Sequence, residues 1–217
     1  MADLYPQPYT TTSPVLANYS YTDIANGTGV ITLYPCMADD TISTEELFLT
    51  EKITTPHKQT KVISGNTTTE ADVDYNFDLT PFNITKTAAG TAIITFSHKR
   101  TSGGTTWHVS SRLMIAVKII KWDGTTETLL GSKMLYDYPS STIDTDMHNA
   151  TMLIPLDLTT FAVGDILRLQ FTANATGDNG YSPGITIGID PTAVDTGSFT
   201  SPYTTQTKLN IPFRLDL

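Results

Sequence analysis

The residues best suited to chemistry are Cys36, the single cysteine of this 217-residue chain, and four histidines, His57, His98, His108 and His148. No two histidines have the spacing of a ligand pair on one helical turn, and one thiol cannot build a cysteine-rich zinc site. A reactive thiolate needs basic surroundings or a helix N-terminus, whereas two aspartates follow this cysteine within four residues. The sequence therefore predicts no metal, no cofactor and an inert, buried thiol.

Motifs of covalent catalysis are also missing from the sequence. It contains neither a Gly-x-Ser-x-Gly nucleophile elbow nor a glycine-rich phosphate loop. A pair of carboxylates can hydrolyse glycosides, but nothing in the sequence selects one acidic pair over another. We therefore predict no catalytic residues and a protein that is not an enzyme.

Two segments allow either a binding role or a purely structural one. The loop around Asp178-Asn179-Gly180 offers oxygen ligands suited to calcium, although its spacing does not match the twelve-residue helix-loop-helix site. Asn-Gly also favours a tight turn. Trp107, which follows a Gly-Gly pair, suits stacking against a sugar, or it anchors the next strand, because tryptophan is usually largely buried. We favour the structural interpretation of both segments.

The charge of the chain limits its partners. A net charge of -9 and a pI near 4.7 disfavour nucleic acid, because binding it depends on Lys and Arg that neutralise phosphates. Anionic membrane surfaces are disfavoured for the same reason, and the longest nearly apolar run, residues 113–120, is too short to cross a bilayer. The first residues lack the basic start and apolar run of a signal peptide, so we expect synthesis in a cytoplasm.

Threonine gives the strongest indication of fold, with 40 copies in the chain. Its β-branched side chain suits a pleated, half-exposed surface. Apolar and polar residues alternate in several runs, which predicts antiparallel strands with one buried face. Asp123-Gly124 predicts a hairpin, Gly164-Asp165 a turn, Pro35 the end of a strand, and Pro212 a bulge or an edge strand. The runs are residues 29–34, 92–97, 110–122, 126–133, 150–158, 166–171, 185–190 and 209–215.

These patterns predict an all-β protein, namely one antiparallel β-sandwich over residues 24–217. About eight to ten strands with some long connections favour a jelly roll. Residues 1–23 are expected to form an extended N-terminal arm, because its prolines resist strand pairing and its tyrosines suit docking on a neighbouring subunit or on the sheet. A short helix is expected at Ser43–Glu46. Met152, Ile154, Leu156 and Leu158 are expected to share one face. The predicted core is Ile94, Phe96, Leu113, Ile115, Val117, Ile119, Ile154, Leu156, Leu167, Leu169, Phe171, Ile187 and Phe213.

The middle of the chain has a distinctive order of elements. A long apolar strand ends at Trp122, Asp123-Gly124-Thr125 turns it back, and a later strand carries Phe-Ala-Val-Gly-Asp-Ile-Leu-Arg-Leu at residues 161–169. This order, over the 60 residues 110–169, resembles jelly-roll β-sandwiches in structural proteins of tailed bacteriophages, notably head decoration or cement proteins and fibre tips. Similar phrases occur in trimeric TNF-like and carbohydrate-binding sandwiches.

The resemblance implies a virion structural protein, most simply a capsid decoration or cement protein or another capsid-associated assembly protein. Its partners would be a capsid or other virion protein and further copies of itself, with a trimer favoured. It would be made in the host cytoplasm and work in the virion. The alternative is a carbohydrate- or receptor-binding module of a phage fibre, for which Trp107 and Tyr181 are the aromatic residues to test.

Overall fold

A computed structural model describes residues 28–37, 47–51, 59–64, 73–102, 112–137, 147–176, 183–189 and 207–214. These residues form eleven strands, and no helix occurs among them, so the predicted all-β class is confirmed. The N-terminal arm and the helix expected at Ser43–Glu46 lie outside the described residues. No helix long and apolar enough to cross a membrane is found in the part of the chain that was searched.

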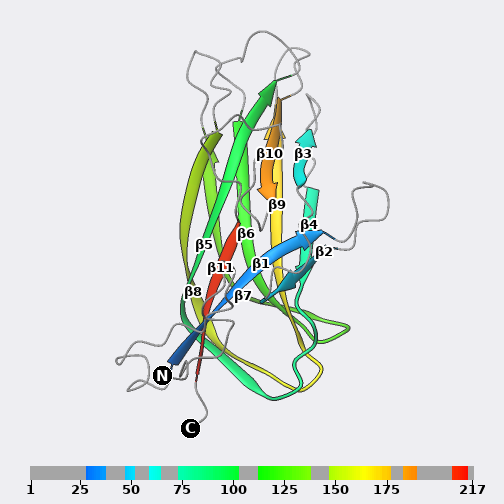
Figure 1. Ribbon diagram of the computed structural model, residues 1–217, viewed down its shortest axis with the longest axis vertical. Helices are drawn as coiled ribbons and strands as arrows, with labels where there is room; N and C mark the ends of the chain where they lie inside the picture. Colours follow the sequence, from blue (N-terminus) through cyan, green and yellow to red (C-terminus); the bar gives the residue numbers. More distant parts are fainter. Residues whose placement is uncertain are drawn as a thin grey trace, which may run out of the picture.

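The strands form one continuous eleven-stranded sheet whose two halves, joined through β1 and called here the first and second sheets, face each other as the layers of a sandwich (Figure 1). In the first sheet, β5 pairs with β8 on one side and with β10 and β11 on the other. Strand β10 pairs in turn with β3, and β11 pairs with residues 28–33 of β1. The strands of the first sheet are β1 (Thr28–Met37), β3 (Gln59–Ser64), β5 (Lys86–Ser102), β8 (Met147–Phe161), β10 (Pro183–Ile189) and β11 (Lys208–Arg214).

The second sheet has the order β1-β2-β4-β9-β6-β7. Its further strands are β2 (Leu47–Thr50), β4 (Val73–Asp78), β6 (Arg112–Trp122), β7 (Glu127–Asp137) and β9 (Ile166–Thr176). Most neighbours in space are not neighbours in sequence, as in a jelly-roll-like sandwich. Every pair is antiparallel except β2 and β4, which are parallel and matched at Phe48 and Asp78.

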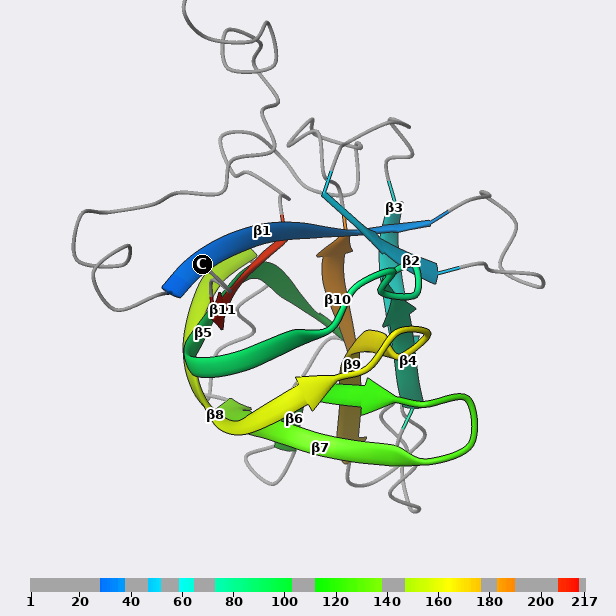
Figure 2. The same ribbon diagram turned by 90° about the horizontal axis from the view of Figure 1, so that it is seen from below.

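Strand β1 belongs to both sheets, as Figure 2 shows from below. Its residues 28–33 pair with β11, and its residues 34–37 pair with β2. The prediction that Pro35 ends this strand is therefore wrong, since the strand continues to Met37. Proline is tolerated because β1 has already left β11 at Leu33, so one edge of the strand makes no ladder hydrogen bonds at Pro35.

The core between the sheets agrees closely with the predicted one. Leu156 is only partly buried and packs against the core, and the side chain of Leu113 lies outside those described. The buried members of the predicted core, each at most 3% exposed, are Ile94, Phe96, Ile115, Val117, Ile119, Ile154, Leu167, Leu169, Phe171, Ile187 and Phe213.

The expectation that Leu158 shares the inner face with Ile154 is wrong. Leu158 is 63% exposed, whereas Phe161 is fully buried. The register of β8 against β5 shifts between the pairs that involve Ala88 and Gly90. One extra residue of β8 at this bulge reverses which side chains face inward. The alternation of the sequence therefore changes phase within a single strand.

The predicted turns are confirmed. Gly124 has φ of +96°, and Asp123 Oδ1 accepts hydrogen bonds from the backbone N–H groups of Thr125 and Thr126 at 2.9 and 2.7 Å. The hairpin pairs Trp122 with Glu127. Pro212 lies where the register of β11 against β5 shifts, which confirms the bulge and not the edge strand, because β11 lies between β1 and β5.

Candidate functional site

Most side chains singled out in the sequence lie outside the described residues, namely His57, Trp107, His108, Tyr181 and the segment Asp178-Asn179-Gly180. Cys36 is described, in the half of β1 that pairs with β2, and is 2% exposed. Its burial agrees with the predicted environment of the thiol.

The other two histidines are brought together by the fold. His98 in β5 lies opposite His148 in β8, with ring centroids 5.8 Å apart. Their spacing in the sequence does not indicate this contact, because the long antiparallel pairing of β5 and β8 cannot be read from histidine spacing. No group of three or more His, Cys, Asp or Glu side chains that could hold a metal is found in the described part of the chain.

An organised set of polar side chains lies on the outer face of the second sheet, across β4, β9, β6 and β7. Successive residues of a strand point to opposite faces, so the residues that alternate with core members Phe77, Leu169 and Val117 point outward. We call this set the polar face. Its members are Asp74, Asn76, Asp78, Lys118, Glu127, Arg168, Gln170 and Thr172.

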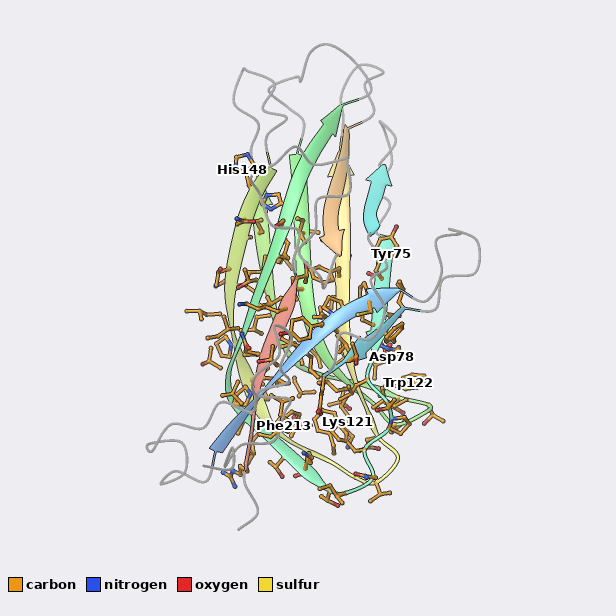
Figure 3. The ribbon with its side chains drawn as sticks, viewed as in Figure 1. Tyr75, Asp78, Lys121, Trp122, His148 and Phe213 are labelled. Carbon is orange, nitrogen blue, oxygen red and sulfur yellow. The ribbon has the colours of Figure 1, made fainter. Side chains whose placement is uncertain are left out.

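Arg168 is the centre of one end of the polar face. Its Nε and Nη2 donate to the two carboxylate oxygens of Asp78 at 2.6 and 2.8 Å, and its Nη1 contacts Glu127. The guanidinium carbon lies 4.8 Å from the centroid of the Trp122 ring, and Figure 3 shows Asp78 and Trp122 on the same side of the molecule. The hydrogen bonds to Asp78 are the largest cause that raises the pKa of Arg168, so this arginine stays charged.

The rest of the polar face continues the same pattern along the strands. Gln170 accepts a hydrogen bond from Lys118 Nζ and donates one to Asn76, both at 2.8 Å. Thr172 donates to Asp74. Gln170 and Thr172 are only 5% and 4% exposed, although they point outward, so neighbouring side chains cover them. The polar groups of this face therefore bind one another.

A second ionic contact ties the two sheets together near the lower end of the sandwich. Lys121 Nζ lies 2.9 Å from Asp165 Oδ2 and donates to the carbonyl oxygen of Thr160 in β8 at 2.9 Å. The backbone N–H of Ala162 also donates to Asp165 at 2.7 Å. The hydrogen bond from Lys121, followed by that from Ala162, lowers the pKa of Asp165. This contact links β6 of the second sheet to β8 of the first.

Apolar side chains are exposed on the outer face of the first sheet, along β5 and β8. Ile93 and Leu153 lie directly opposite each other and are 38% and 58% exposed. Next to them are Pro155 and, past the bulge, the exposed Leu158. We call Ile93, Leu153, Pro155 and Leu158 the apolar strip. Threonines flank it, including the hydrogen-bonded pair Thr95 and Thr151.

Comparison with known proteins identifies a similar fold but no family for this chain. No protein-family model matches the chain, and no curated protein matches it. The chain is similar to the structure of an aminopeptidase from the marine sediment archaeon Thaumarchaeota archaeon, with 9% identity and a TM-score of 0.53 over 84% of this chain and 37% of that one. This chain therefore spans little more than a third of that protein, and the likeness is one of fold.

Two weaker similarities concern other β-sandwiches. A carbohydrate-binding module of the β-sandwich superfamily has 15% identity and a TM-score of 0.35, over 76% of this chain and 73% of that chain. The VP2 subviral particle of infectious bursal disease virus has 13% identity and a TM-score of 0.31, over 86% of this chain and 51% of that one. The structural neighbours thus include a carbohydrate-binding module and a viral particle protein, together with hydrolases.

Proposed function

We propose that this chain is a structural protein of a virus particle, a decoration or cement-type subunit that binds a capsid or another virion protein and catalyses no reaction. The observation that carries the proposal is the apolar strip. Large apolar side chains gathered on one outer face commonly mark a protein interface. Burying a fully exposed Leu or Ile side chain is worth about 1.5–3 kcal/mol, and Ile93, Leu153 and Leu158, which are 38–63% exposed, would each gain a part of this on docking.

The surroundings of the strip fit attachment to a protein surface. Its threonine neighbours are uncharged, so burying them requires no desolvation of ionic groups. The polar face lies on the opposite sheet and carries the ionic contacts of Arg168. With a net charge of -9, the rest of the surface would keep decorated particles apart in solution.

A particle-binding assay tests this proposal. Quantitative mass spectrometry of gradient-purified particles should find the chain at many copies per particle. Purified chain added to particles that lack it should bind, and Leu153→Glu should weaken this binding at least tenfold. The matched control is Met134→Glu on the outer face of the second sheet, because Met134 is also about half exposed, at 48%. Absence from particles, or equal binding by both variants, would refute the proposal.

A carbohydrate- or receptor-binding role is the second candidate, and the polar face favours it. Sugar recognition combines an aromatic ring with planar hydrogen-bonding groups, and Trp122 lies beside Arg168 with Asp78 and Glu127 already in place. Trp107 and Tyr181, the aromatic residues expected from the sequence, stay untested because they lie outside the described residues.

A glycan array distinguishes this candidate from the first. Under the second candidate, sugar binding is reproducible, is lost in Trp122→Ala and is retained in Leu153→Glu. Under the first candidate, no glycan binds and Trp122→Ala still attaches to particles.

A further inference from the structure

We infer that the N-terminal arm of one copy docks, through Tyr5-Pro6-Gln7-Pro8-Tyr9, into a groove on a neighbouring copy. The inference deepens the proposed assembly function and rests on it. The groove has a volume of about 620 Å³ and lies between the end of β2 and the loop that joins β4 to β5. It opens where the parallel pair of β2 and β4, matched only at Phe48 and Asp78, comes to an end.

The walls of the groove are held in place before any ligand arrives. The backbone N–H of Phe82 donates to the carbonyl oxygen of Asp165, and the N–H of Gly164 donates to that of Phe82, both at 2.9 Å. The Phe82 ring also packs edge-on against Phe161 and Phe213, with centroids 5.0 and 5.8 Å away. A preformed site avoids much of the entropy cost of ordering on binding.

The chemistry of the groove suits a proline-rich peptide that carries aromatic residues. Phe48, Leu79 and Pro81 supply apolar surface, Phe82 adds little because it is only 8% exposed, and Thr50 and Thr80 also line the groove. Aromatic-lined grooves bind proline-rich segments because the extended polyproline conformation is already formed in the free peptide.

The charges of the groove also fit this segment. Glu51 and Lys86 also line the groove, so its formal charge is balanced. Residues 4–22 of the arm carry no charged side chain, although the whole chain has a net charge of -9. Two copies with this net charge repel each other. Contact between an uncharged segment and a groove without net charge adds no further repulsion, which favours this pairing.

The length of the segment between Tyr9 and β1 allows exchange between copies. Gly29 pairs with Phe213, whose ring contacts Phe82 of the groove wall. Own-chain docking would therefore need only a short span, yet 18 residues separate Tyr9 from Thr28. This tether reaches about 60 Å when extended. A flexible chain of 18 residues has an r.m.s. length of about 23 Å, so a tether of this length lets the segment reach a groove on its own chain or on a neighbouring copy, and exchange of an identical element joins protomers at low cost.

Photo-crosslinking of the full-length chain tests the inference. Tyr9 is replaced by benzoylphenylalanine, and ¹⁵N-labelled and unlabelled chains are mixed before irradiation. We expect crosslinks from position 9 to peptides that contain residues 47–51 or 79–83, including pairs that join a labelled to an unlabelled chain. Thr80→Arg, at an exposed position of the groove, should reduce these crosslinks at least fivefold. Thr91→Arg, also exposed but on β5, should leave them unchanged.

Three results would overturn the inference. Crosslinks to other parts of the chain would show that the groove is not the site, as would an unchanged yield in a folded Thr80→Arg variant. Crosslinks confined to chains of one isotope would show that the arm docks on its own chain. The crosslinking test uses purified protein alone, so a negative result would not contradict attachment to particles. Likewise, absence of the chain from particles would not contradict docking of the arm seen by crosslinking.

Discussion

Arg168 in β9 and Asp78 in β4 form a two-point ion pair between neighbouring strands, although 90 residues separate them in the sequence. The side chain of Arg168 is only 12% exposed. Water therefore screens the pair less than it screens a typical surface contact. The planar fork of arginine is needed to reach both oxygens at once.

Arg168→Lys should lower the free energy of unfolding by about 1–3 kcal/mol, because lysine keeps the charge but loses the paired geometry. Urea unfolding at neutral pH measures the change. The control is Arg214→Lys at the exposed end of β11, for which we expect less than about 0.5 kcal/mol. Equal effects of the two substitutions would show that the fork contributes nothing.

Gly131→Ala should destabilise the fold, because β7 and β8 approach each other closely at this residue. A Cβ atom at position 131 would clash with the carbonyl oxygen of Pro155 and would lie 2.9 Å from Ile154 Cγ2. Overpacking of this kind costs about 1–3 kcal/mol, measurable by thermal or urea unfolding. Ser132→Ala, at the exposed neighbouring position, is the control, and a neutral Gly131→Ala would contradict the close approach.

The contact between Asp165 and Lys121 predicts a loss of stability in acid. The pKa of Asp165 is lowered from its ordinary value of 3.8 in the folded chain, so the carboxylate stabilises the fold above that pH. This contribution is lost as the pH falls below about 4 and through the folded-state pKa. Melting temperatures between pH 7 and 2 should therefore fall less steeply for Asp165→Asn than for the parent chain. Asp157→Asn, which removes an exposed carboxylate of β8, controls for net charge and should follow the parent curve.

Leu169→Ala should cost about 2–5 kcal/mol of unfolding free energy, since its side chain is fully buried between the sheets. Leu158→Ala removes the same atoms from a side chain that is 63% exposed, and we expect a loss below about 0.5 kcal/mol. Chemical denaturation of both variants measures the difference. A large loss for Leu158→Ala would place this residue in the core and contradict the bulge in β8.

Sequence patterns predicted correctly those features that depend only on residues close together in the chain. The alternation around Ile94 and around Leu169 placed the core face correctly, because side chains of a regular strand must alternate between faces. Asp123-Gly124 located the hairpin, because only a few residue types adopt its backbone angles. At Leu158 the same rule failed, because a bulge adds one residue and leaves no mark in the pattern of polarity.

Contacts between distant strands could not be predicted from the sequence. The pairing of His98 with His148, and of Arg168 with Asp78, depends on which strands become neighbours and in which register. That choice is made by the packing of both sheets and not by the residues that flank each side chain. The polar face was missed for this reason, although its outward positions could be identified strand by strand.

The sharing of β1 between the two sheets has a mechanical consequence. A pull on the N-terminal end of β1, as from an arm held by a neighbour, loads the hydrogen bonds to β11 and to β2 within one continuous strand. Residues 28–33, which pair with β11, lie nearer to the pulled end than residues 34–37, which pair with β2, so the ladder to β11 is loaded first. We expect such a subunit to release β1 from β11 before it releases β1 from β2 under force.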